Sequence, residues 1–224
     1  MRADNDASTE RTAPDVAVLC DFDGTIVPCD TVEMIYGRFA APPCDELNQR
    51  WIRGEISTQE ELQGCFATIK ASRAEMEASL VSIGIDPAFP AILDFCRQRR
   101  YRFAIVSDGL DWIIDFILDR HGIDGLSVYC NEVRFRPDGF RFFFPLYDPG
   151  SPLRGVSKPS IIRRYQLAGF KVVFIGDGLS DTDAVEVADV VYARATLLDY
   201  CRKQGIDAIG FSDFSDLLAK WRMP

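Results

Sequence analysis

Four short apolar runs, each followed by turn residues, constrain the fold of this chain more than any other feature. They cover residues 16–20, 102–106, 171–175 and 189–193. An apolar run without polar alternation is typical of a strand buried on both faces, as in a parallel sheet. Helical periodicity over residues 89–99 and 111–120 lies between the runs. This alternation predicts an α/β fold with a doubly wound parallel sheet.

Two segments break the alternation. Residues 28–86 contain no good strand and predict four helices, over residues 31–39, 44–53, 58–69 and 73–82. Because this block lies between the first two strands, we interpret it as a small helical cap. Pro137, Asp138 and Gly139 separate two aromatic-rich runs and predict a β-hairpin over residues 133–144. The predicted organisation is a flexible tail (1–14), a core (15–27 and 87–224) and a cap (28–86).

The charge balance restricts the possible partners. The 224 residues include 25 basic and 34 acidic side chains, a formal net charge of −9. A chain this acidic repels nucleic acid and anionic lipid, so we expect neither as a partner. An anionic substrate would also be repelled by the protein as a whole. Its site would therefore need positive charge supplied locally, by a metal ion, a Lys or backbone N–H groups.

Cysteine usage and the lack of targeting signals indicate the compartment. The chain has seven Cys, without a CxxC pair, and one His. This argues against a structural zinc site and favours reduced thiols in a cytoplasmic protein. Neither a membrane-spanning run nor a secretory signal is recognisable. The sequence leaves open whether the protein is a monomer or a homodimer.

Polar side chains directly follow three of the predicted strands. The first strand leads into Asp21-Phe22-Asp23-Gly24-Thr25, the second into Ser107-Asp108-Gly109, and the third into Gly176-Asp177-Gly178-Leu179-Ser180-Asp181. Ligands of open parallel sheets bind outside the carboxyl ends of the strands. Asp21, Asp23, Asp177 and Asp181 would therefore converge and repel one another unless a hard divalent cation such as Mg²⁺ joined them. Lys158, at the start of a predicted helix, is a candidate cation for a phosphoryl group.

In order and position, these motifs resemble those of the haloacid dehalogenase superfamily of phosphatases. The resemblance implies that Asp21 is the nucleophile and Asp23 the general acid and base. It implies phosphate contacts from Thr25, Ser107, Asp108, Gly109 and Lys158. It also implies that Asp21, Asp23 through its carbonyl, Asp177 and Asp181 hold Mg²⁺, with Asp181 bound directly or through water. The expected activity is hydrolysis of a small phosphorylated metabolite through an aspartyl-phosphate intermediate.

The segments around the motifs resemble methionine-salvage enol-phosphate phosphatases within the phosphoserine-phosphatase-like branch. Asp108 departs from that group and resembles the phosphocholine and phosphoethanolamine enzymes, where an Asp faces an ammonium group. Asp30 and Asp108 are therefore candidates for substrate specificity. Residues 60–69 contain no Arg for a substrate carboxylate, which disfavours phosphoserine.

Other interpretations stay open. Ser107 could be a plain helix cap, Lys158 a solvated lysine, and Asp30 and Asp108 capping residues. Phosphoryl transfer to an acceptor other than water, and non-catalytic sensing of a phosphorylated ligand, are the alternative functions.

Overall fold

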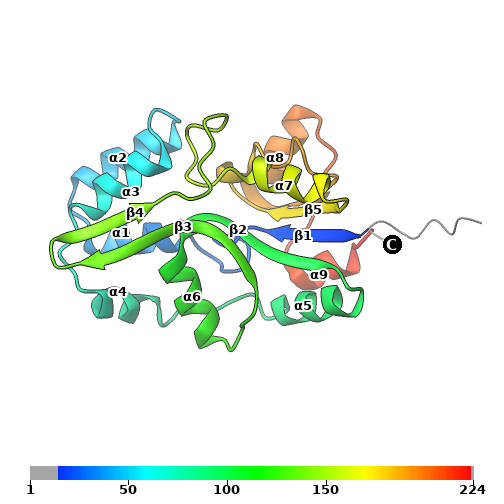
Figure 1. The fold of residues 1–224 in the computed structure, drawn as a ribbon, viewed down its shortest axis with the longest axis horizontal. Coiled ribbons are helices and arrows are strands. Elements are labelled where there is room, and N and C mark those ends of the chain that lie inside the picture. The colour runs from blue at the N-terminus through cyan, green and yellow to red at the C-terminus, as the bar shows by residue number, and fades with distance from the viewer. Residues whose placement is uncertain (1–14, 223–224) are drawn as a thin grey trace, which may run out of the picture.

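A seven-stranded sheet forms the centre of the molecule (Figure 1). The computed structural model describes residues 15–222, so the predicted tail over residues 1–14 lies outside it. The strand order is β4-β3-β2-β1-β5-β6-β7. Every neighbouring pair is parallel except β3 and β4. The strands are β1 (Val16–Cys20), β2 (Arg102–Leu110), β3 (Ser127–Arg136), β4 (Gly139–Phe143), β5 (Lys171–Gly176), β6 (Val190–Ala193) and β7 (Ile209–Gly210).

Helices cover both faces of the sheet (Figure 1). One face carries α5 (Phe89–Gln98), α6 (Asp111–Arg120) and α9 (Phe214–Ala219), and the other carries α7 (Lys158–Leu167) and α8 (Ala195–Gln204). Side chains of β1 alternate between the two layers: Val18 lies in one apolar cluster and Leu19 in the other. The sequence of a strand buried on both faces is continuously apolar, which is why β1 could be predicted. The predicted doubly wound α/β class is confirmed.

Residues 28–86, here called the helical insert, contain four helices between β1 and α5. They are α1 (Thr31–Phe39), α2 (Pro43–Ile52), α3 (Thr58–Phe66) and α4 (Arg73–Leu80). Capping boxes at Ser57 and Ser72 start α3 and α4, because each serine bonds the glutamate three residues later. Phe66 of α3 packs edge-on against two phenylalanines of β4, Phe140 and Phe142, and so joins the insert to the edge of the sheet. The insert boundaries remain predictions.

The predicted hairpin is present but belongs to the main sheet. Arg136 of β3 pairs with Gly139 of β4 across a tight turn, where Gly139 has φ +125°. The first half of β3 pairs in parallel with β2, from Ser127 to Tyr129. The sequence pattern showed only the hairpin, because the segment before residue 133 contains no long apolar run.

The expectation that all cysteines are reduced thiols is wrong for two of the seven. Cys44 of α2 and Cys65 of α3 form a disulfide, and the other five are free thiols. The two cysteines are 21 residues apart, a separation that signals no pairing in the sequence. Packing of α2 on α3 brings their Cα atoms to 4.6 Å, within the range that a disulfide requires. The bond therefore fixes these two helices against each other.

In the part of the chain that the structure describes, no helix combines the length and the apolar character that crossing a bilayer requires.

Candidate functional site

The candidate site lies where the chain leaves the central strand. β1 pairs with β2 on one side and with β5 on the other, and Cys20 is in register with Ile105 and Ile175. A strand whose neighbours wind in opposite directions creates a crevice at its carboxyl end. A pocket of about 440 Å³ opens there. Strand ends and insert helices together line it, among them Asp21, Asp23, Asp30, Glu33, Tyr36, Trp51, Thr58, Glu61, Ser107, Asp108, Gly109 and Asp177.

Lys158 is a buried cation beneath the pocket rather than a solvated lysine. Its side chain is 1% exposed. The ammonium Nζ lies 2.7 Å from Asp21 Oδ1 and also donates to Asp181 Oδ1. Burial alone would lower the pKa of Lys158, but the carboxylates of Asp181 and Asp21 outweigh burial and raise it. Lys158 therefore stays protonated and holds the Asp21 carboxylate in place.

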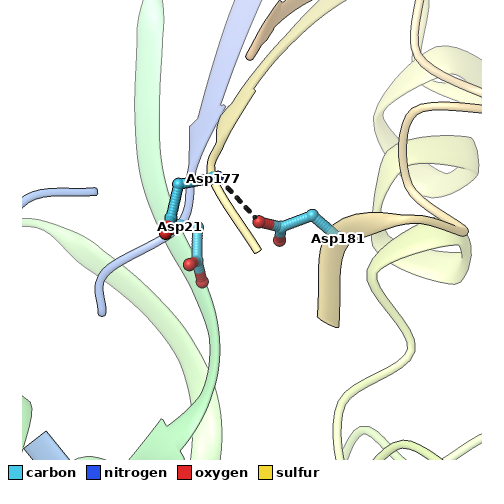
Figure 2. A group of neighbouring side chains, drawn as sticks. All are labelled: Asp21, Asp177 and Asp181. Atoms are coloured by element: carbon cyan, nitrogen blue, oxygen red, sulfur yellow. Dashed lines mark hydrogen bonds between the residues drawn. The ribbon is translucent and has the colours of Figure 1, made fainter. Parts of the chain in front are cut away.

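The acidic cluster is under-neutralised, which makes it suitable for a divalent cation. Asp21, Asp177 and Asp181 each offer an oxygen, all within 4.8 Å of one another (Figure 2). Burial raises the pKa of Asp21 well above its usual range, and the charge of Asp181 adds to the effect. When all three carboxylates are ionised, the one ammonium, which bonds Asp21 and Asp181, leaves two negative charges uncompensated. Mg²⁺ would balance this charge with oxygen ligands, the type it prefers.

The three carboxylates differ in how many of their oxygens are free. Asp181 is fully buried, and its Oδ2 accepts from the N–H groups of Asp177 (3.0 Å) and Gly178 (3.1 Å) while its Oδ1 accepts from Lys158. Figure 2 shows it facing the other two carboxylates from the turn after β5. Oδ2 of Asp21 and Oδ2 of Asp177 carry no such bond within the described residues. Asp21 and Asp177 are thus better placed as direct metal ligands, and Asp181 suits contact through water.

Asp23 lies beside Asp21 with its carboxylate facing the pocket. Its Oδ1 accepts from the backbone N–H of Thr31, at 2.9 Å. Burial raises the pKa of Asp23 to about 6, although that hydrogen bond opposes the shift. A Cβ at Gly109 would lie 2.9 Å from Asp23 Oδ2, so a larger residue there would require the Asp23 carboxylate to shift. A carboxyl group with a pKa near neutrality can both donate and accept a proton, as a general acid and base must.

Ser107, Asp108 and Gly109 lie inside β2 rather than after it. The pairing of β2 with β3 shifts register between Val106 and Leu110, which bulges the strand at these residues. The N–H of Gly109 donates to Ser107 Oγ at 3.0 Å, and both residues line the pocket. In this geometry the Gly109 N–H is already donated to Ser107, so phosphate contacts from these residues stay a prediction.

The contacts of Thr25 differ from the phosphate contact that the sequence predicts for it. It is fully buried, and its hydroxyl donates to Asp177 Oδ1 at 2.8 Å. Because the hydroxyl proton of Thr25 is already donated, Thr25 in this geometry orients the carboxylate of Asp177. Asp30, the other candidate of this loop, caps α1 by accepting from the N–H of Glu33 at 2.8 Å. Asp30 also lines the pocket, so both of its predicted roles stay open.

Asp108 ties the insert to the core. Its Oδ1 accepts from the N–H groups of Gly155 (3.0 Å) and Val156 (2.9 Å), and its Oδ2 accepts from Thr58 of α3 at 2.7 Å. Asn131 also donates to Oδ1, at 3.2 Å. These bonds leave little acceptor capacity for a substrate amine. The geometry favours a structural role for Asp108, while its proposed substrate contact stays a prediction.

Replacing Asp108 with Ala is expected to lower the free energy of unfolding by about 2–3 kcal/mol, because backbone donors would be left unpaired. Urea unfolding of the purified protein measures this. Asp108→Asn keeps one acceptor oxygen and should lose less, and exposed Asp119→Ala should change stability by less than about 0.5 kcal/mol. Unchanged stability in Asp108→Ala, together with a raised KM for an amine-bearing ester, would instead place this carboxylate on the substrate.

Sequence reasoning missed three residues around the site. Glu61 of α3 and Tyr36 of α1 line the pocket, and Arg194 bonds the carbonyl oxygens of Gly24 and Thr25. A signal for Glu61 was available: it falls on the same helical stripe as Thr58, Leu62 and Cys65, all buried. An acidic residue on an apolar stripe indicates a functional or paired carboxylate. Arg194 carried the signal used for the other strands, because it directly follows the predicted strand over residues 189–193.

Comparisons with known proteins identify the family of this chain. Residues 18–186 match the family model described as haloacid dehalogenase-like hydrolase. A 2-hydroxy-3-keto-5-methylthiopentenyl-1-phosphate phosphatase from Exiguobacterium sp. is 30% identical over 206 residues, which cover 90% of this chain and 95% of that protein. A phosphatase of the same name from Brevibacillus brevis is 28% identical over 207 residues, 91% of this chain and 93% of that protein.

A solved structure shares the fold. A phosphoserine phosphatase, determined as an analogue of its phospho-aspartyl intermediate, matches with a TM-score of 0.69 and 19% identity, over 93% of this chain and 100% of that one. At this identity the match concerns the fold alone. The family resemblance read from the sequence motifs, and the prediction of an enzyme, are confirmed by the family match and the curated relatives.

Proposed function

Because the chain belongs to the haloacid dehalogenase-like hydrolase family, we propose that it is a Mg²⁺-dependent phosphatase of a small phosphorylated metabolite, with Asp21 as the nucleophile. The observation that carries the proposal is the meeting of Asp21, Asp23, Ser107 and Asp177 in one pocket, above buried Lys158. Nucleophile, proton donor, phosphate donors and metal ligands are thereby all present within one small volume.

The first half of the reaction transfers the phosphoryl group to the protein. Lys158 holds the Asp21 carboxylate through Oδ1, and one oxygen of that carboxylate attacks phosphorus and forms an acyl phosphate. The bond from phosphorus to the leaving oxygen breaks, and protonated Asp23 gives that oxygen its proton. Ser107 and the ammonium of Lys158 stabilise the charge on the transferring group.

The second half restores the enzyme. Asp23, now a carboxylate, takes a proton from water, and the water oxygen attacks the phosphorus of the acyl phosphate. The bond to Asp21 breaks and inorganic phosphate leaves. A pKa of about 6 suits Asp23 to both steps, because neither protonation state is strongly disfavoured near neutral pH.

Asp21, Asp177 and the backbone carbonyl of Asp23 would hold the metal ion. Mg²⁺ bound there would supply a Lewis acid for a phosphate oxygen and the counter-charge that the cluster lacks. Thr25 and Asp181 would orient the ligands through their hydrogen bonds to Asp177.

An enol phosphate with a short apolar chain is the substrate class we propose first. The relatives' name describes such a compound, with a hydroxyl, a keto group and a methylthio end. The insert side of the pocket supplies a matching apolar wall from Val32, Trp51, Ile52 and Leu62. Phosphoethanolamine, phosphocholine and phosphoserine remain the alternative esters. A cytoplasmic location is part of the same proposal.

Metal removal tests the chemistry. Phosphate release from p-nitrophenyl phosphate is expected to fall at least about 1,000-fold with a chelator, because a Lewis acid contributes several kcal/mol to the transition state. Added Mg²⁺ should restore it, as measured by a colorimetric phosphate assay without any added acceptor. Chelator-resistant release would contradict the metal role. Release that requires an alcohol acceptor would favour phosphoryl transfer, and ligand-induced stabilisation without turnover would favour sensing.

A further inference from the structure

The insert side of the pocket contains a buried carboxylate that the proposed mechanism does not use. Glu61 of α3 is 6% exposed, and Tyr36 of α1 is 7% exposed. The hydroxyl of Tyr36 donates to Glu61 Oε2 at 3.0 Å. Within residues 15–222, Glu61 Oε1 has no hydrogen-bond partner. Unlike the fully buried polar atoms that lack a partner, it retains some accessible surface. This oxygen is therefore available to a group in the pocket.

The charge of the pocket wall limits what that group can be. Asp30, Glu33 and Glu61 of the insert line the pocket together with Asp108 of β2, and none of the described residues that line the pocket is Lys or Arg. Burial raises the pKa of Glu61 to about 7, and the charges of Asp108 and Glu33 add to the shift. A carboxylate on the leaving group would meet only like charge there. A hydroxyl can bond to Glu61 in either protonation state.

The surroundings of Glu61 favour an uncharged ligand. Its sequence neighbour Leu62 is buried and lines the pocket with Val32, Trp51 and Ile52. A hydroxyl next to apolar atoms would bond Glu61 while its carbon chain covers this wall. An ammonium group would be attracted by the acidic residues of this wall but would give up more hydration than a hydroxyl on reaching its apolar part.

We propose that Glu61, oriented by Tyr36, binds a hydroxyl of the leaving group and so selects uncharged hydroxyl-bearing phosphate esters over carboxylate-bearing ones. This proposal rests on the proposed phosphatase function and deepens it. It makes Glu61 a specificity residue of the insert, separate from the phosphate end of the pocket.

Matched three-carbon esters test the proposal. The wild-type protein is expected to hydrolyse glycerol 3-phosphate with a kcat/KM about tenfold above that of n-propyl phosphate, since one good hydrogen bond is worth about that factor. Phosphoserine should be used poorly. The double variant Glu61→Leu/Tyr36→Phe removes donor and acceptor together and should erase the preference for glycerol 3-phosphate. Hydrolysis of n-propyl phosphate by the double variant should fall less than hydrolysis of glycerol 3-phosphate, because the lost hydrogen bond is made only to the hydroxyl-bearing ester.

Two further variants separate specificity from folding. Glu61→Gln keeps an acceptor oxygen and should retain part of the preference. Glu46→Gln makes the same charge change on exposed α2, where the Glu46 side chain is 72% exposed, and should behave as wild type. An equal loss for every ester in the double variant would reveal a structural role and overturn the proposal. So would an unchanged preference for glycerol 3-phosphate, or a preference for phosphoethanolamine that the double variant loses.

Binding measurements keep this test independent of turnover. Titration calorimetry of the same esters with wild type and the double variant reports the preference even without catalysis. If no ester is hydrolysed, the proposed function fails, while a glycerol 3-phosphate preference that depends on Glu61 would still support the proposed hydroxyl site. Equal binding of glycerol 3-phosphate and n-propyl phosphate would overturn the hydroxyl site alone.

Discussion

Asp21→Asn is expected to lower the rate of phosphate release by at least about 10,000-fold, the range seen when a nucleophile is removed. The amide keeps the shape of the side chain and can still accept from Lys158 Nζ, now 2.7 Å from Asp21 Oδ1. It has no free carboxylate oxygen to attack phosphorus. Single-turnover phosphate release from p-nitrophenyl phosphate measures the loss. Thermal unfolding should show a melting temperature at or above that of wild type, since one buried like charge is gone.

Two controls separate nucleophilic attack from metal binding. Asp177→Asn changes a carboxylate of the same cluster, and its activity should recover in part at high Mg²⁺, whereas that of Asp21→Asn should not. Asp23→Asn should react slowly and accumulate a protein species heavier by one phosphoryl group, visible by mass spectrometry. Substantial turnover by Asp21→Asn would exclude this side chain as the nucleophile.

The strand ends were the part of the site that the sequence revealed most directly. Asp21 and Asp177 follow β1 and β5, and parallel pairing places both at one edge of the sheet. No tertiary contact beyond that pairing is needed to bring them together. This is why the fold class and the acidic cluster could both be predicted from short apolar runs and the residues after them.

The sequence could not indicate which partner each motif side chain would bond. Thr25 and Asp181 belong to the motifs, but their bonds point to Asp177 and Lys158. Asp108 bonds loop and insert donors that are 47 to 50 residues away in the chain. Such partners depend on how loops pack, and loop packing leaves no periodic pattern in the sequence. The Cys44–Cys65 disulfide escaped prediction because it depends on how α2 packs on α3.

Lys158→Met is expected to have the second largest effect, on stability as well as on activity. The substitution leaves Asp21 and Asp181, 4% and 0% exposed, without the cation between them. Breaking a buried ion pair by removing one partner costs about 3–5 kcal/mol. Urea unfolding in the presence of a chelator measures this, so that a bound metal does not mask the repulsion. Phosphate release should fall at least about 1,000-fold, because a charge contact to the transferring group is lost.

A second substitution separates the two consequences of losing Lys158. In the double variant Lys158→Met/Asp181→Asn one buried charge fewer remains, so much of the lost stability should return. Activity should not return, because no ammonium faces the phosphoryl group in either variant. If activity recovered with stability, Lys158 would act only by holding the fold together. A Lys158→Met protein as stable as wild type would mean that Asp21 is already protonated when the lysine is absent, which its raised pKa permits. In that case the activity loss alone would measure what the ammonium contributes to phosphoryl transfer.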